Sequence, residues 1–398
     1  MSNCIIAQSG GPTAVINASV IGVVEENFKK GFYDNVYAGI NGIEGILNKK
    51  LVNLSEKSKE DLQNFRFTPS SGLGSCRYKM KDVRENNEEY IKLFSILKEL
   101  DIDTFFYVGG NDSMDTVAKL SEYTKINNIP VKVIGIPKTI DNDLPITDHT
   151  PGFGSAAKLI STIALETYLD SSVYTNNGIF ILETMGRDTG WLAASACTSK
   201  LNGKPVADFI YLPEVAFSEE NFLRDVKEKF DSQNQVYIVA SEGLKDKDGN
   251  FISEVRISGC HDNFGHAQLG GVGNYLKNII INAGITKRVK ALELGVIQRC
   301  SMHIASQTDL DEAYMVGKAA LNYASDGNTG YMVAIKREDS SIYESTTFLA
   351  EASSVANSIK YVPMNWINEQ GNNLTEEAYK YISPLIDDNM PSYVRFNK

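Results

Sequence analysis

Short hydrophobic runs alternate with helical patterns along the first third of the chain. The apolar run at residues 4–7 leads into a Gly-Gly turn, and residues 14–28 then place apolar side chains at helical spacing. Two further runs, at residues 105–108 and 131–136, are rich in aromatic and β-branched side chains, which are typical of strands. Strands that alternate with helices in this way predict a mostly parallel sheet covered by helices.

The same alternation returns in the middle of the chain. The pattern predicts strands over residues 178–183 and 236–240 and helices over residues 155–168, 219–230 and 269–283. A further helix at 310–324 and a strand at 331–336 follow, and we expect this segment to rejoin the first lobe. The sequence therefore predicts an α/β protein with two lobes.

Composition and charge narrow the classes of function. The 398 residues are 42% hydrophobic and 22% charged, which is ordinary for a globular protein, and the length suggests at least two lobes or domains. A net charge of −11 argues against broad binding to nucleic acid or anionic lipid. The five cysteines are scattered without a CxxC pair, and no basic leader or long apolar run occurs. We expect a cytoplasmic protein that binds neither nucleic acid nor a membrane.

Three loops that directly follow predicted strands have unusual content. In open parallel sheets, ligands bind outside the carboxyl ends of the strands, so these loops are the first candidates for a site. After the first strand, Gly10 and Gly11 stand at a helix start, where bare backbone N–H groups can bind an anion. A structural tight turn explains the same two glycines. The pattern leaves both interpretations open.

The second loop follows residues 105–108 and combines two glycines with oxygen-bearing side chains. Asn111 and Asp112 offer hard oxygen ligands that suit Mg²⁺. Alternatively, Asp112 or Ser113 caps the helix that follows. These residues by themselves do not decide between a ligand site and a helix cap.

The third loop places charges at the end of a strand that we expect to be buried. Lys138, Asp141 and Asp143 stand close together in the segment Pro-Lys-Thr-Ile-Asp-Asn-Asp, directly after residues 131–136. Charged groups beside a buried strand are costly unless they are paired or used in function. We therefore predict a functional site at this loop.

Together, the three loops resemble those of the phosphofructokinase family. Four further segments extend the resemblance: Gly-Ser-Cys-Arg ending at Arg77, Met-Gly-Arg-Asp-Thr-Gly-Trp at residues 185–191, Ser-Glu-Gly around Glu242, and Gly-Val-Ile-Gln-Arg ending at Arg299. These landmarks stand in family order over about residues 3–335. An ordered set is far more specific than any one of its motifs.

The resemblance implies a particular architecture. It consists of two Rossmann-like three-layer lobes with mostly parallel sheets and the active site in the cleft between them. The expected division is a phosphoryl-donor lobe at residues 1–150, rejoined by about 304–360, a sugar-phosphate lobe at 151–303 and a C-terminal extension at 361–398. Family relatives also lead us to expect a homodimer or homotetramer.

The resemblance further implies a reaction and the residues that perform it. Phosphoryl transfer from pyrophosphate to the 1-hydroxyl of fructose 6-phosphate would give fructose 1,6-bisphosphate and phosphate, with Mg²⁺ as cofactor. Asp141 would accept the hydroxyl proton, Thr139 and Asp143 would orient it, and Arg187 would also act in catalysis. The binding residues divide by ligand: Gly10, Gly11, Arg77, Asp112 and Lys138 for the donor; Asn111 for Mg²⁺; and Thr139, Ile140, Asp141, Met185, Gly186, Arg187, Glu242, Lys290 and Arg299 for the sugar phosphate.

Two positions indicate the donor. ATP-dependent relatives usually carry glycine where Asp112 and Lys138 stand, whereas the pyrophosphate-dependent branch carries aspartate and lysine. A carboxylate at Asp112 would repel the α-phosphate of a nucleotide, and Lys138 would bind compact pyrophosphate as a point charge. The alternatives are ATP-dependent transfer and a catalytically silent paralogue that binds sugar phosphates. A silent paralogue has no need of a base such as Asp141.

Three positions depart from the family pattern. Asn111 stands where many relatives have aspartate, so Mg²⁺ would receive a neutral ligand there and depend more on phosphate oxygens. Gly178 falls where ATP-dependent bacterial relatives place a substrate arginine of the neighbouring subunit, and Val296 replaces a polar phosphate ligand. Lys290 is expected to supply part of the missing charge.

Overall fold

The chain forms two compact units. The computed structural model describes residues 2–84, 87–253, 271–387 and 393–396. The first unit consists of Met1–Phe153 and Arg299–Lys360, and the second of Gly154–Gln298 and Tyr361–Lys398. The residues from Tyr361 onwards therefore pack with the second unit.

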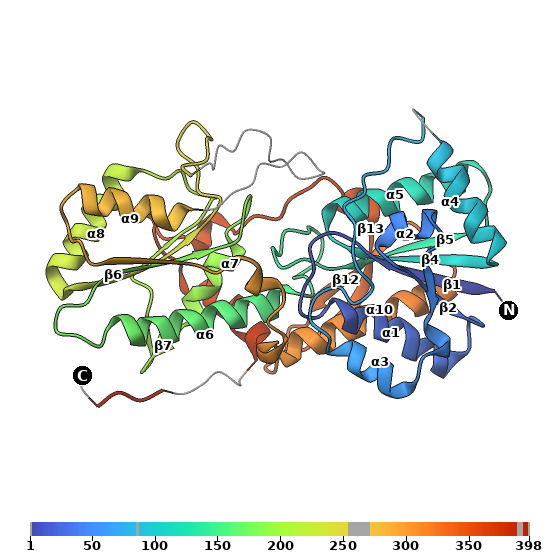
Figure 1. Cartoon of the computed structure of the whole chain (residues 1–398), viewed down its shortest axis with the longest axis horizontal. Helices are drawn as coiled ribbons and strands as arrows, with labels where there is room; N and C mark the ends of the chain where they lie inside the picture. The colour runs from blue at the N-terminus through green and yellow to red at the C-terminus, as the bar shows by residue number, and fades with distance from the viewer. Residues whose placement is uncertain (1, 85–86, 254–270, 388–392, 397–398) are drawn as a thin grey trace. The chain divides into compact units, whose positions relative to one another are not determined.

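A seven-stranded sheet forms the centre of the first unit (Figure 1). Its strands, in spatial order, are β13 (Ser345–Glu351), β12 (Tyr331–Arg337), β5 (Lys132–Pro137), β4 (Ile102–Gly109), β1 (Asn3–Gln8), β2 (Val36–Gly39) and β3 (Leu51–Asn53). The strands from β12 to β2 pair in parallel, and only the edge strands β13 and β3 pair antiparallel. The carboxyl ends of β1, β4 and β5 are therefore neighbours at one edge of the sheet.

Helices cover both faces of this sheet (Figure 1). They are α1 (Ile16–Lys30), α2 (Gly42–Leu47), α3 (Lys59–Arg66), α4 (Glu88–Glu99), α5 (Asn111–Ile126), α10 (Gln307–Ser325) and α11 (Ala352–Val355). Side chains of α1, α3 and α10 pack on one face, and side chains of α2, α4 and α5 pack on the other.

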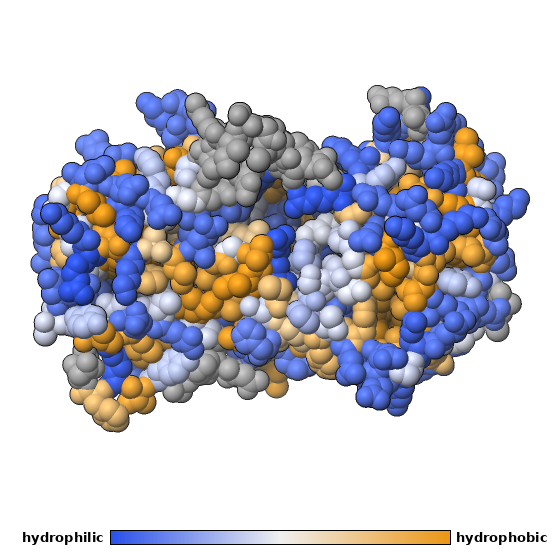
Figure 2. All heavy atoms as spheres, in the orientation of Figure 1, coloured by the Kyte–Doolittle hydropathy of each residue, from blue (hydrophilic) through white to orange (hydrophobic). Residues whose placement is uncertain are grey.

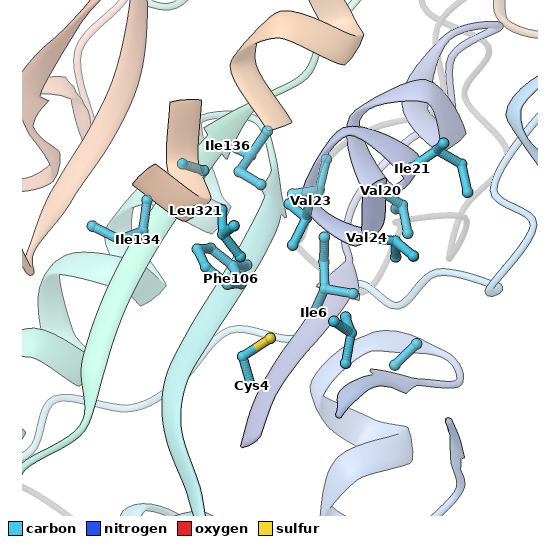
Figure 3. Close-up of a cluster of buried hydrophobic side chains, with 14 of the residues drawn as sticks. Cys4, Ile6, Val20, Ile21, Val23, Val24, Phe106, Ile134, Ile136 and Leu321 are labelled. Atoms are coloured by element: carbon cyan, nitrogen blue, oxygen red, sulfur yellow. The ribbon is translucent and has the colours of Figure 1, made fainter. Parts of the chain in front are cut away.

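The alternation of side chains along each strand creates these two cores. In β1, Cys4 and Ile6 join the cluster under α1 and α10, whereas Ile5 and Ala7 join the cluster on the opposite face. Figure 3 shows the first cluster, in which side chains from β1, β4 and β5 meet those of α1 and α10. Because both faces of the central strands are buried, β1 and β5 are mostly apolar runs in the sequence.

The second unit has a smaller parallel sheet. Its strands, in spatial order, are β11 (Val289–Glu293), β6 (Gly178–Thr184), β10 (Gln235–Ser241) and β9 (Phe209–Tyr211). A short hairpin of β7 (Lys200–Leu201) and β8 (Lys204–Pro205) stands apart from it. The helices are α6 (Phe153–Ser171), α7 (Trp191–Ala194), α8 (Glu219–Gln233), α9 (Val272–Asn282) and α12 (Glu376–Ile382). Side chains of α8 and α9 pack on one face of the sheet, and Tyr168 of α6 packs against Tyr237 on the other.

The expected fold class is confirmed, because both sheets are mainly parallel and alternate with helices along the chain. The strands expected at residues 4–7, 131–136 and 236–240 correspond to β1, β5 and β10 with small shifts at their ends. The helix expected to begin at Leu269 begins at Val272 among the described residues, and Leu269 itself lies outside them. The pattern did not predict α3 or α4.

The face that Figure 2 shows is mostly hydrophilic, with separate hydrophobic patches on it. Large exposed apolar side chains on the first unit, such as Phe28, Ile91 and Ile126, are far apart in sequence. Within the described residues, no helix is both long and apolar enough to cross a membrane.

A buried histidine links loops of the first unit to α10. His149 Nε2 lies 2.6 Å from Glu312 Oε2, and its Nδ1 lies 2.9 Å from Asp148 Oδ1. Arg337 also donates to Asp148, at 3.1 Å, and Tyr343 donates to Glu312, at 2.6 Å. Burial opposes the charged form of His149, but the two carboxylates outweigh it and raise its pKa to about 9. The imidazole is therefore protonated at neutral pH and compensates two carboxylates.

Replacing this histidine should destabilise the fold in a pH-dependent way. His149→Gln leaves Glu312 buried without its cation, which should cost about 3–5 kcal/mol near pH 6. Since the pKa of His149 is about 9 in the folded chain and about 6.5 when unfolded, its stabilisation is complete below about pH 6.5 and is lost as pH rises through about 9. Thermal unfolding at pH 6, 7.5 and 9 should therefore show a Tm gap between wild type and variant that narrows with pH. A constant gap would mean that His149 is neutral.

Candidate active site

Two hydrogen bonds to residues 75 and 76 fix the glycine turn at the end of β1. Gly10 has φ 75°, a conformation that favours glycine. Its N–H donates to the carbonyl of Cys76 at 3.0 Å, and its own carbonyl accepts from Ser75 Oγ at 2.7 Å. These bonds bring Arg77, the residue after Cys76, to the glycine turn.

Lys138 reaches the same turn from the end of β5. Its side chain is only 3% exposed, and its Nζ donates to the carbonyl of Gly11 at 2.5 Å. A Cβ atom on Gly10 would lie 3.4 Å from this Nζ. The absence of a side chain on Gly10 thus leaves room beside the ammonium group, where a ligand can approach both the backbone and the charge.

Charges of both signs surround Lys138. Asp141 and Asp143 attract its ammonium group, and Arg299 and Arg77 repel it. Burial has the largest effect, and the pKa of Lys138 falls to about 8. The structure thus brings these five predicted site residues together in the first unit. Three cations close to one glycine turn are suited to a small, highly charged anion.

Local hydrogen bonds shape the 139–143 loop. Thr139 Oγ1 accepts from the backbone N–H of Asp141 at 3.1 Å, and Ile140 is buried. Asn142 has φ 52°, so the loop turns sharply between the two aspartates. Asp143 Oδ1 is buried without a hydrogen-bond partner in the structure, and burial together with Asp141 raises the pKa of Asp143. Asp143 can therefore hold a proton closer to neutral pH than an exposed carboxylate can.

The Asn-Asp loop lies beside this group, because the last residue of β4 pairs with the last residue of β5. Helix α5 is capped by Gly110 and not by the side chain of Asp112 or Ser113, so the helix-cap interpretation is wrong. Asp112 is exposed in the first turn of α5. Asn111 Oδ1 accepts from the backbone N–H of Asn357 at 2.6 Å. That bond occupies one lone pair of the predicted Mg²⁺ ligand and leaves the second.

Arg299 belongs to the first unit and approaches the glycine turn. A Cβ atom on Gly11 would lie 3.1 Å from Arg299 Nη1. Arg299 Nε is buried without a hydrogen-bond partner in the structure. The sequence assigned this arginine to the sugar phosphate, and the structure places it beside residues assigned to the donor. Its N–H groups are therefore available to an anion at the glycine turn.

A second group forms in the second unit at the ends of β6 and β10. Glu242 Oε1 accepts from the backbone N–H of Gly186 at 3.4 Å, and the N–H of Glu242 donates to Thr184 at 2.9 Å. Gly186 has φ 129°, which favours glycine, and a Cβ on Gly243 would clash with the backbone of Arg187. The predicted sugar residues at 185–187 therefore lie close to Glu242.

Lys290 does not join this group within one chain. The register of β11 places it beside Phe180, five residues before Met185, which is roughly 16 Å along a strand. Its Nζ lies 3.6 Å from Asp170, and both side chains are exposed. The assignment of Lys290 to the sugar phosphate stays a prediction.

Two residues that no sequence motif singled out by itself support these groups. Gln298 is buried, and its Oε1 accepts from the N–H of Met185 at 3.2 Å. Lys360 is half-buried against the 139–143 loop, where its N–H donates to the carbonyl of Asp143 at 2.8 Å. Gln298 stands inside a segment that the sequence had singled out. No motif marks Lys360, because its partners are more than 200 positions away.

The donor set of the first unit suits a magnesium ion that arrives with a phosphate ligand. No cluster of three or more His, Cys, Asp or Glu side chains suited to a metal occurs in the described part of the chain. Mg²⁺ usually binds through one or two carboxylates together with substrate phosphates and water. Asp143 supplies a buried carboxylate oxygen without a partner, and Asn111 supplies a carbonyl oxygen. These residues fit that mode of binding.

Comparison with known proteins agrees with this arrangement. The family profile described as Phosphofructokinase matches residues 3–323. The chain is 41% identical over 397 residues to the pyrophosphate--fructose 6-phosphate 1-phosphotransferase of Methylococcus capsulatus, covering 98% of this chain and 93% of the relative. It is 41% identical over 387 residues to the enzyme of the same name from Halomonas elongata, covering 96% and 91%.

A solved structure extends the similarity to three dimensions. The crystal structure of a pyrophosphate-dependent phosphofructokinase from Nitrosospira multiformis is similar with a TM-score of 0.87 and 37% sequence identity. The match covers 99% of this chain and 94% of that one. Sequence and fold therefore point to the same family over almost the whole length.

Proposed function

Because this chain belongs to the phosphofructokinase family, we propose that it transfers a phosphoryl group from pyrophosphate to the 1-hydroxyl of fructose 6-phosphate. The products are fructose 1,6-bisphosphate and orthophosphate. The observation that carries the donor assignment is Lys138, which is buried at the glycine turn with its Nζ on the carbonyl of Gly11. Relatives with this donor in their names, at 41% identity, support the same assignment.

The donor is bound by the cations at the glycine turn. Lys138, Arg77 and Arg299 offer charge, and the backbone around Gly10 and Gly11 offers close approach. Pyrophosphate is compact, so a point charge at Lys138 suits it. The carboxylate of Asp112, exposed at the start of α5, disfavours the longer phosphate chain of a nucleotide through like-charge repulsion.

The acceptor hydroxyl is activated by the 139–143 loop. Asp141 accepts the proton of the 1-hydroxyl as its oxygen bonds to phosphorus, and the bond from phosphorus to the bridging oxygen of pyrophosphate breaks. Thr139 fixes Asp141 through the bond from its N–H. The transferred group is loosely bonded to both oxygens in the transition state, so alignment and charge stabilisation supply most of the catalysis.

Magnesium and the sugar phosphate complete the proposal. Asn111 and Asp143 would hold Mg²⁺, which would neutralise charge on the phosphate oxygens. Met185, Gly186, Arg187 and Glu242 bind the sugar phosphate. The proposed compartment is the cytoplasm.

Initial-rate assays with the two donors test this proposal. At equal Mg²⁺, fructose 6-phosphate should be phosphorylated with pyrophosphate at a kcat/KM at least about 100-fold above that with ATP.

Asp112→Gly removes the repelling carboxylate, so the ratio of kcat/KM for ATP to that for pyrophosphate should rise about tenfold or more. Asp101→Gly is the control and should leave this ratio unchanged. Asp101 lies at an exposed turn with φ 52°, a conformation that glycine adopts easily. Asp115 is less suitable because it pairs with Lys119. A wild type that prefers ATP contradicts the donor, and no turnover with either contradicts the function.

A further inference from the structure

The segment at residues 357–360 contacts the Asn-Asp loop, which follows β4, through Asn111. Asn111 Oδ1 accepts from the N–H of Asn357, and its Nδ2 donates to the carbonyl of Ser358 at 2.5 Å. One partner is a donor and the other an acceptor, so only an amide satisfies both. A carboxylate at this position would face the Ser358 carbonyl without a proton to share. This requirement gives a physical reason for asparagine at a position where the family pattern has aspartate.

The same segment ends at Lys360, which contacts the 139–143 loop. Its backbone N–H donates to the carbonyl of Asp143 at 2.8 Å, and its Nζ donates to Asn142 Oδ1 at 3.2 Å. The Nζ also donates to the carbonyls of Thr147 and Asp148, at 3.3 and 2.7 Å. Four bonds from one residue therefore fix the loop on both sides of its second aspartate.

Charge adds to these bonds. Burial lowers the pKa of Lys360 to about 8, while Asp148 and Asp143 favour its charged form and Arg337 opposes it. These two aspartates therefore attract the ammonium group towards the segment that its hydrogen bonds already hold.

We propose that Lys360 is a positioning residue for phosphoryl transfer, which holds the 139–143 loop in its reactive geometry. Residues 357–360 thereby link this loop to the Asn-Asp loop through Asn111. The proposal rests on the function proposed above. Lys360 does not touch the reacting atoms. It acts on Asp141 through the backbone of Asp143 and the side chain of Asn142.

The test replaces the ammonium group with an apolar side chain of similar length. Lys360→Met should lower kcat about tenfold or more and leave the KM values for pyrophosphate and fructose 6-phosphate within about threefold. Hydrogen exchange of the backbone amides in residues 139–148 should become faster.

A lysine of the second unit supplies the matched control. Lys158 donates to both carboxylate oxygens of Asp387, at 3.0 and 2.9 Å, and the two side chains are only 8% and 10% exposed. Lys158→Met should lower Tm, as Lys360→Met does, but should leave kcat and hydrogen exchange at residues 139–148 unchanged. If Lys360→Met does not fold, Lys360→Gln, which keeps a donor and loses the charge, takes its place in the same measurements.

The outcomes separate this proposal from the proposed function. A wild type without turnover refutes the function, and hydrogen exchange then still decides whether Lys360 holds the loop. An active wild type whose Lys360 variants keep normal kcat and normal hydrogen exchange at residues 139–148 refutes the positioning role. A fall in Tm with unchanged kcat means that Lys360 only stabilises the fold, which also overturns the proposal.

Discussion

Asp141→Asn is expected to lower kcat by about 10²–10⁴-fold and to leave the KM values for both substrates within a few-fold. The amide keeps the size of the side chain and cannot accept the hydroxyl proton. The lost interaction belongs to the transition state, so the loss should appear in kcat. Steady-state kinetics with pyrophosphate and fructose 6-phosphate at saturating Mg²⁺ measure both constants.

Asp143→Asn is the matched comparison for this result. Its carboxylate lies in the same loop, and burial and Asp141 raise its pKa. At saturating Mg²⁺, which offsets the loss of a metal ligand, kcat should fall less than in Asp141→Asn because the base at Asp141 is kept. A larger loss of kcat in Asp143→Asn would transfer the role of base from Asp141 to Asp143.

Lys138→Met is expected to lower kcat/KM for pyrophosphate by about 10²–10³-fold, comparable to the loss of one oriented donor to a developing charge. Lys138 is the buried cation at the glycine turn, where it is fixed by the carbonyl of Gly11. Donor titrations at saturating fructose 6-phosphate give the effect on pyrophosphate directly.

Lys132→Met is the control for charge on the same strand. Lys132 begins β5, whereas Lys138 follows its last residue. The Lys132 Nζ lies 3.7 Å from Asp103, a half-exposed pair at the opposite end of the strand. Its replacement should leave kcat/KM for pyrophosphate within about twofold. Equal losses in the two variants would show that net charge, and not the position of Lys138, governs donor binding.

Most of the parallel framework was predictable from local pattern. The strands β1 and β5 are buried on both faces, so their apolar runs stand out against the polar turns that follow. Helix α3 was not predictable in this way, because Leu62 is its only buried residue among eight. Strand β3 has three half-buried residues, which leave no periodic signal.

The sequence by itself determined which loops form the candidate site, because parallel strands place the loops after β1, β4 and β5 at one edge of the sheet. It also indicated the chemical groups in them, since glycines, a lysine and two aspartates at strand ends have few structural explanations.

Only the tertiary structure decided how these groups are used. The bond from Lys138 to Gly11 joins positions 127 apart, and the bonds from Asn111 to Ser358 and from Lys360 to Asn142 join positions 247 and 218 apart. Local spacing carries no information about such pairs, because their meeting depends on strand order and on the path of the chain after β13. Folding thus places Arg299 beside the glycine turn. It also brings the N–H of Asn357 to Asn111 Oδ1 and the N–H of Lys360 to the carbonyl of Asp143.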